Sequence, residues 1–158
     1  MKKIVVYIVL CLAVMLSSCQ PYIVGSQDII EYSAGGYTVD IKKGQGMELF
    51  GADIISHTAG EIKFAAPVYK IGEYAFKDSN LEWIVLPEHV EKIEQGAFMS
   101  CEQLYRITLP ASLKKIESRA FDFCYDLYKV HCEATTPPTI PEGLFDHCID
   151  YYFNISSI

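Results

Sequence analysis

Residues that could carry acid–base, nucleophilic or metal chemistry are scattered along this chain and do not converge on a reaction site. No nucleotide-binding, zinc-protease or nucleophile-elbow motif is present, and the acidic residues do not follow the calcium-loop pattern. No two cysteines have the C-x-x-C spacing of a structural zinc site. His131 and Cys132 are adjacent in a predicted strand, so they should point to opposite faces. We therefore expect no enzymatic activity, no metal and no cofactor. The four histidines lie in separate segments, at His57, His89, His131 and His147.

Cys19 is the residue whose surroundings predict a covalent modification. Two lysines precede an apolar run, residues 4–16, which is too short to span a bilayer as a mature helix. The sequence LSSC that follows resembles a lipobox, in which the cysteine is acylated and becomes the new N-terminus. An ordinary secretory signal cleaved near Ser18 is the alternative, but it would not require a cysteine. We expect residues 1–18 to be a lipoprotein signal peptide and Cys19 to carry the lipid.

The predicted lipid anchor indicates where the protein is located, and its net charge argues against some classes of partner. Several acyl chains on one cysteine hold a protein stably at a membrane. We expect a lipid-anchored protein of the cell envelope, on the outer membrane, facing either the periplasm or the exterior. Loss of the two signal-peptide lysines changes the net charge from −7 to −9. Such an acidic protein is a poor ligand for nucleic acid or anionic headgroups, so membrane contact should depend on the lipid.

A repeat of 22 to 24 residues organises most of the chain. LEWIVLPEHVEKIEQGAF (81–98) is followed by LYRITLPASLKKIESRAF (104–121) and by a degraded copy over 127–145, and a weaker unit begins near Ile62. A repeat of this length cannot bury its own apolar face, so it must stack on its neighbours. Two columns keep the same intervals of 22, 23 and 24 residues: Phe76, Phe98, Phe121 and Phe145, and Ile71, Ile93, Ile116 and Ile140.

Each repeat predicts one short strand and one return path. The strand, L-x-x-I-x-L, should join its neighbours in a parallel sheet on one face, and Pro87 and Pro110 should end it because proline cannot donate a ladder hydrogen bond. The return segments are short enough for irregular or helical turns only, and the phenylalanines should plug the core between repeats. The fold class predicted for residues 61–148 is a leucine-rich repeat solenoid, mostly β.

The pattern L-x-x-I-x-L-P-x-x-[VL]-x-x-I-x-x-x-A-F-x-x-C resembles the BspA-type (Treponema-like) leucine-rich repeat of bacterial surface proteins. The resemblance covers about residues 60 to 148. It implies an all-repeat solenoid without catalytic machinery, used for adhesion and protein binding, and it does not identify a ligand.

The cysteines of the repeat region share one column. Cys101, Cys124 and Cys148 recur at the position of Ser79, so they should stack on successive repeats. An exported protein meets an oxidising compartment, where disulfides are permitted. We favour a ladder of small, buried, free side chains, because stacking alone does not provide the Cβ geometry of a disulfide.

The segments outside the repeats predict a tether, a cap and an end strand. Residues 19–34 are interpreted as a tether, and residues 35–60 as an N-terminal cap containing a β-hairpin, formed by residues 37–41 and 47–50. Residues 149–158 predict a final strand or a tail, because Phe153 and Ile155 alternate with polar positions. We expect this end to self-associate through its uncovered edge, or to be the frayed last repeat of a truncated family member. A tail that folds back over its own core is the remaining alternative.

Outward positions of the predicted strands form a stripe of aromatic and cationic side chains. Aromatic residues beside arginine are typical of binding hot spots, although exposed aromatics can also serve cross-strand packing. We expect this stripe to bind a protein or a glycan. Its columns are Trp83, Arg106 and Lys129; Glu82, Tyr105 and Tyr128; and Val85, Thr108 and His131.

The sequence therefore predicts an anchored lipoprotein that acts as a protein-binding or adhesion module. Two alternatives stay open. A carbohydrate-binding accessory lipoprotein would also expose Trp83 and Tyr105 on a flat sheet, and a structural envelope protein would have no ligand for the stripe.

Overall fold

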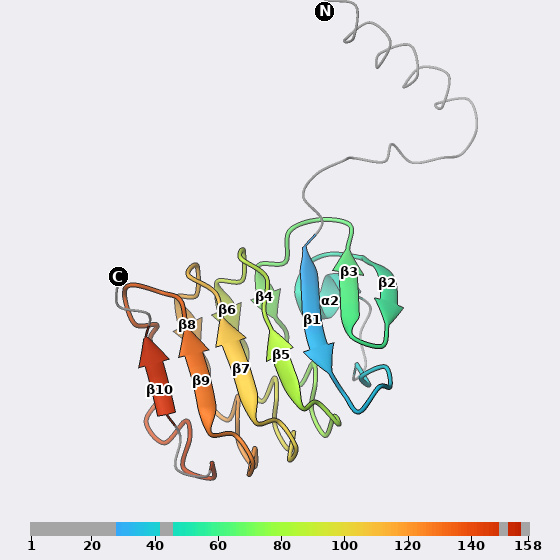
Figure 1. Cartoon of the computed structure of the whole chain (residues 1–158). Coiled ribbons are helices and arrows are strands. Elements are labelled where there is room, and N and C mark those ends of the chain that lie inside the picture. The colour runs from blue at the N-terminus through green and yellow to red at the C-terminus, as the bar shows by residue number, and fades with distance from the viewer. Residues whose placement is uncertain (1–27, 42–45, 149–151, 156–158) are drawn as a thin grey trace, which may run out of the picture.

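Two β-sheets lie on either side of the apolar core (Figure 1). The structure, a computed structural model, describes residues 28–41 and 46–148 and the backbone of 152–155. The larger sheet has the order β10-β9-β7-β5-β1-β3-β2, and the smaller sheet, β4-β6-β8, lies behind it. The large-sheet strands are β1 (Ile29–Ser33), β2 (Ile54–Thr58), β3 (Glu61–Phe64), β5 (Trp83–Val85), β7 (Arg106–Leu109), β9 (Lys129–Cys132) and β10 (Tyr152–Ile155). The small-sheet strands are β4 (Lys70–Ile71), β6 (Lys92–Ile93) and β8 (Lys115–Ile116), and the helix is α2 (Gly46–Phe50).

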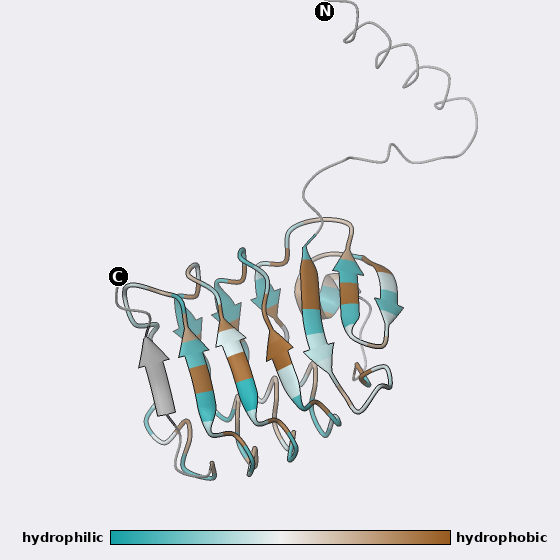
Figure 2. Cartoon of the chain, in the orientation of Figure 1, coloured by the Kyte–Doolittle hydropathy of each residue, from teal (hydrophilic) through white to brown (hydrophobic). Residues whose placement is uncertain are grey.

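Strands of successive repeats pair in the predicted register. β5, β7 and β9 are parallel neighbours, and their central residues Ile84, Ile107 and Val130 are mutual partners with no exposed surface. The residues between these inward positions face solvent, so hydrophobic and hydrophilic bands alternate along β7 and β9 (Figure 2). The parallel sheet is thus confirmed for these repeats. β10 extends it beyond β9, as the alternation in the C-terminal segment predicts.

The return path of each repeat contains a second strand that the sequence analysis did not predict. β4, β6 and β8 are two residues long and pair in parallel, in place of purely irregular or helical turns. Each consists of a lysine on the outside and an isoleucine in the core. Because the same dipeptide recurs at the same place in three repeats, its backbone groups meet their equivalents at hydrogen-bonding distance.

A stack of phenylalanine rings runs through the core from repeat to repeat. The ring centroids of Phe76, Phe98, Phe121 and Phe145 lie 5.3, 5.4 and 5.5 Å apart, with interplanar angles of 7–13°. Phe50 of α2 lies at the N-terminal end of the stack, 5.8 Å from Phe76. The predicted phenylalanine column is therefore confirmed, and α2 supplies the ring that covers its first member.

The cysteine column is a ladder of thiols that also satisfies backbone carbonyls. Cys101 and Cys124 are free and buried, as predicted. Each thiol donates to a carbonyl of the preceding repeat, Cys101 Sγ to Phe76 O and Cys124 Sγ to Phe98 O, both at 3.0 Å. The hydrogen bond with Cys101 and burial raise the pKa of Cys124. Cys148 is only partly buried, and this burial raises its pKa to about 11. The repeat spacing predicted the stacking but not the bonds to carbonyls.

The predicted hairpin between residues 37–41 and 47–50 is wrong. Residues 37–41 form no strand, although the N–H of Val39 donates to the hydroxyl of buried Tyr32 at 3.1 Å. Residues 46–50 form α2, because Gly46, Leu49 and Phe50 recur at helical spacing and are all buried. The hairpin of this region is instead β2–β3, which is antiparallel and turns through residues 59–60.

The predicted tether, residues 19–34, contains a strand of the large sheet. β1 lies between β3 and β5 and is antiparallel to both. Ile30 and Tyr32 point into the core, while the residues that alternate with them face outward. β3 is therefore not a direct neighbour of β5, in contrast to the uninterrupted parallel sheet that the repeat pattern predicts. Residues 19–27 lie outside the described part of the chain.

The last repeat departs from the predicted column at Ile140. This residue occupies the position of three buried isoleucines but is 45% exposed. A single bridge, Lys115 to Thr139, joins its segment to β8. Two adjacent prolines precede this segment and disrupt the strand pairing. No further repeat within the described residues lies against it.

Truncation of a ring in the middle of the stack tests the core. Phe121→Ala should lower the free energy of unfolding by about 3–5 kcal/mol, because the ring is fully buried between two others. Urea denaturation measures this loss. Tyr37→Ala, at a side chain that is 72% exposed, is the control and should change stability by less than about 0.5 kcal/mol. Equal effects of the two substitutions would contradict the stacked core.

Candidate functional site

The predicted site residues lie together on the outer face, the surface of the large sheet that points away from the small sheet. Trp83, Arg106 and Lys129 are register partners across β5, β7 and β9. Tyr128 and Lys129 are exposed, and the other members are partly buried. The structure thus gathers all eight predicted positions on one surface. Besides those three, Val85, Thr108 and His131 form a second row, and Tyr105 and Tyr128 precede β7 and β9.

Trp83 and Arg106 form a cation–π pair on this face. The guanidinium carbon of Arg106 lies 5.3 Å from the centroid of the Trp83 ring. The Nε of Arg106 is buried and has no hydrogen-bond partner among the described residues. Such a pair is worth about 0.5–1 kcal/mol at exposed sites and more when desolvated. The contact therefore holds the guanidinium in place on the sheet.

Tyr105 and Tyr128 stack on each other at the start of β7 and β9. Their ring centroids are 6.0 Å apart and their planes differ by 17°. Gln103 and Asp126 line the same shallow pocket beside the two rings. One face of each ring is therefore covered by the other ring.

Two cations of the outer face, Arg106 on β7 and Lys129 on β9, differ from most other cations of the chain, including Lys63 of β3 on the same sheet. Three described cations, Arg106, Arg119 and Lys129, form no ion pair with any described residue. Two of the three are adjacent on the outer face. All six other described lysines lie 2.8–3.7 Å from a carboxylate oxygen: Lys63, Lys70, Lys77, Lys92, Lys114 and Lys115.

Carboxylates occupy the cap end of the same face. Glu31 of β1 and Glu61 of β3 are register partners, and Glu82 accepts a hydrogen bond of 2.5 Å from the Ser33 hydroxyl. β1 thus brings residues to the face that the sequence analysis placed in a tether. The alternation of Ile30 and Tyr32 with polar residues is the signal that could have identified them. Lys63 of β3 lies 2.9 Å from Glu61 and offsets that one carboxylate. The outer face thus keeps an excess of carboxylates at the cap end and presents cationic and aromatic side chains over the repeats.

The small sheet carries a ladder of alternating charges that the sequence analysis did not identify. Lys92 lies 3.2 Å from Glu94 of its own repeat and 3.0 Å from Glu117 of the next. Hydrogen bonds with these glutamates raise the pKa of Lys92, and its bond to Glu117 lowers the pKa of that carboxyl. Lys70 and Lys115 continue the ladder. This surface neutralises its own charge.

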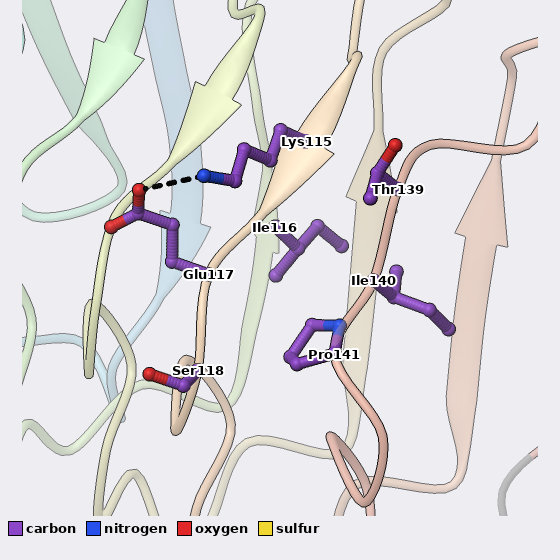
Figure 3. A pocket seen from close by; sticks show the side chains of 7 residues that line it. All are labelled: Lys115, Ile116, Glu117, Ser118, Thr139, Ile140 and Pro141. Atoms are coloured by element: carbon purple, nitrogen blue, oxygen red, sulfur yellow. Dashed lines mark hydrogen bonds and ion pairs between the residues drawn. The ribbon is translucent and has the colours of Figure 1, made fainter.

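A shallow pocket of about 350 Å³ lies where the ladder ends (Figure 3). Ile116, Ile140 and Pro141 line it, and Lys115 at its rim is paired with Glu117. Within the described part of the chain, no three histidine, cysteine, aspartate or glutamate side chains are grouped closely enough to hold a metal ion. The pocket therefore offers mainly apolar contact.

Among residues 28–41, 46–148 and 152–155, no helix is both long enough and apolar enough to cross a membrane.

Comparison with known proteins identifies the family. The family model described as "BspA type Leucine rich repeat region" matches residues 56–157 in six copies. The match begins within the segment predicted as a cap and continues into the C-terminal segment. Neither the curated proteins nor the solved structures gave a match. The model covers well over half of the chain, and the parallel repeat strands agree with it. The chain belongs to the BspA-type leucine-rich repeat family.

Proposed function

We propose that this chain is an exported lipoprotein of the cell envelope that binds a protein partner through the outer face of a short solenoid. Leucine-rich repeats commonly mediate protein binding. The observation that carries the proposal is the joint presence of Trp83 under Arg106 and of Tyr105 against Tyr128 on one open surface. Aromatic and arginine side chains dominate the energetics of protein interfaces. We propose no catalytic role.

The geometry favours a protein over a carbohydrate as the ligand. A sugar ring usually stacks on an open aromatic face. Here Arg106 covers one face of Trp83, and each of the two tyrosines has a face against the other. Fewer open aromatic faces are therefore left for a sugar ring to stack on.

The geometry also argues against a purely structural role for the stripe. Cross-strand packing alone would explain the tyrosine stack. It does not explain why Arg106 and Lys129 stand side by side without a carboxylate, because like charges directly opposite each other destabilise a sheet.

Truncation of the aromatic residues tests the proposed binding face. The full chain, immobilised in detergent, should capture a partner from envelope extracts, and Trp83→Ala or Tyr105→Ala should weaken that capture at least about tenfold. Quantitative mass spectrometry of the captured proteins measures the loss. Tyr37→Ala is the matched control, since Tyr37 is 72% exposed but lies off the strands. A capture pattern that is the same for all these variants, or that a free glycan abolishes, would contradict a protein-binding face.

The anchor is tested by removal of the thiol. Cys19 lies outside the described residues, and the proposal rests on the LSSC sequence after an apolar run. Cys19→Ala should move the protein from the membrane fraction to the soluble fraction, because no acyl chain can then be attached. Fractionation with detergent partitioning measures the change. Retention of the variant in the membrane to the same extent would refute the anchor.

We also propose that the C-terminal end associates with a second copy of the chain. β10 is an edge strand of the large sheet, and edge strands present unpaired backbone groups. Ile140 of the last repeat is exposed, and the pocket in Figure 3 lies between its segment and β8.

Light scattering distinguishes association from a tail that covers its own core. The Cys19→Ala protein should form dimers or larger species at high concentration, and the same protein ending at residue 148 should stay monomeric. The reason is that deletion removes the edge strand β10. A longer chain that is monomeric throughout, and whose stability falls sharply on deletion, would instead support a fold-back cap.

A further inference from the structure

We infer that Arg106 and Lys129 form a carboxylate-binding site, and that the partner presents an acidic segment to it. The inference rests on the proposed function, because it names the chemistry of the partner for the same outer face. The observation behind it is that two adjacent cations form no ion pair with any described residue.

The two cations are neighbours by the geometry of the sheet. Arg106 and Lys129 are register partners on parallel strands, and such strands are about 4.8 Å apart. Both belong to the outward-facing set of positions in their strands. Two like charges at this separation repel each other, and no described carboxylate offsets the repulsion. An external anion placed between them would do so.

A shortage of acidic side chains does not explain why Arg106 and Lys129 lack an ion pair. The chain has 20 acidic residues against 13 basic ones, and the six other described lysines each form an ion pair with a carboxylate. On the small sheet, the corresponding lysines are neutralised by glutamates of their own and the next repeat. The outer face lacks such glutamates at the equivalent neighbours of Arg106: Trp83 and Val85 lie on one side, and Lys129 and His131 on the other.

The guanidinium is already positioned for a ligand. It lies against Trp83, and its Nε is buried without a partner, so the terminal nitrogens are the groups that remain for binding. These nitrogens match the two oxygens of a carboxylate. Lys129 is exposed and adds a second positive charge beside them. Less side-chain freedom is then lost on binding than for an unsupported arginine.

Charge on the rest of the face favours a short acidic segment over an extended polyanion. Glu31, Glu61 and Glu82 occupy the cap end of the same sheet, and Lys63 pairs with only one of them, Glu61. A sulfated glycan or an anionic membrane that lay across the whole face would meet these carboxylates. An acidic loop of a folded protein could cover β7 and β9 alone and contact the adjacent Tyr105 and Tyr128 as well.

Trp83 provides a direct probe, because it is the only tryptophan in the chain. Titration of the full chain with a short polyglutamate peptide should change Trp83 emission in a saturable manner, and calorimetry should give the same affinity. Arg106→Gln or Lys129→Gln should weaken binding at least about tenfold, and raising the ionic strength from about 50 to about 300 mM should weaken wild-type binding too. A polyglutamine peptide should not bind.

Arg119→Gln is the matched control. It removes the same charge from an arginine that also lacks an ion pair, but it lies after β8, on the return path of its repeat. Its polyglutamate affinity should equal that of the wild-type chain. Thermal melts of each variant check that the fold is intact.

Three results would overturn the inference: no saturable polyglutamate binding, equal loss in Arg106→Gln and Arg119→Gln, or tighter binding of heparin than of the peptide. Failure of the proposed function would look different. If Tyr105→Ala loses the captured partner and Arg106→Gln keeps it, the protein-binding face is supported and the carboxylate site is refuted. If neither variant loses the partner, the proposed protein-binding face is refuted as well.

Discussion

Contact between one phenylalanine ring and the next is the interaction on which the rest of this structure depends. Each repeat buries its ring against the ring of its neighbour at 5.3–5.5 Å, close to the spacing that strand pairing imposes. The large-sheet strands and the two-residue strands of the small sheet are therefore held at the same repeat spacing along the stack. A repeat without neighbours could not bury its ring, so the fold exists only as a stack. At the N-terminal end, Phe50 of α2 takes the place of a missing repeat.

With the core fixed by the stack, the two outer surfaces are free to differ. The small sheet repeats a lysine and a glutamate at nearly every level and so neutralises itself. The large sheet replaces that regular pattern with tryptophan, arginine, tyrosine and lysine, and leaves two cations without a counter-charge. The same scaffold thus carries one face whose charges are paired with each other and one face with two unpaired cations. This asymmetry is the physical basis of the proposed function.

Repetition explains which features were predictable from the sequence. Ile107, Phe121 and Cys124 could be placed because each has equivalents one repeat away, and a shared column predicts a shared environment. Single-copy features offered no such comparison. β1 was missed because its partners, β3 and β5, are specified by tertiary packing and lie far along the chain. The helical spacing of Gly46, Leu49 and Phe50 was hidden by the glycines around it. Trp83 and Arg106 were grouped correctly, but the lack of an ion pair between Arg106 and any described carboxylate depends on every neighbouring side chain and is visible only in the structure.

Insertion of β1 between β3 and β5 determines the order in which the sheet can be completed. The ribosome delivers residues 29–33 first, yet their hydrogen-bonding partners are residues 61–63 and 83–85. The nascent chain therefore carries an unpaired strand with two large apolar side chains, Ile30 and Tyr32, until the first full repeat has emerged. Contacts of this sequence separation form slowly compared with the local contacts within repeats. The repeats can assemble by adding to one another, whereas closing the N-terminal end must wait for them.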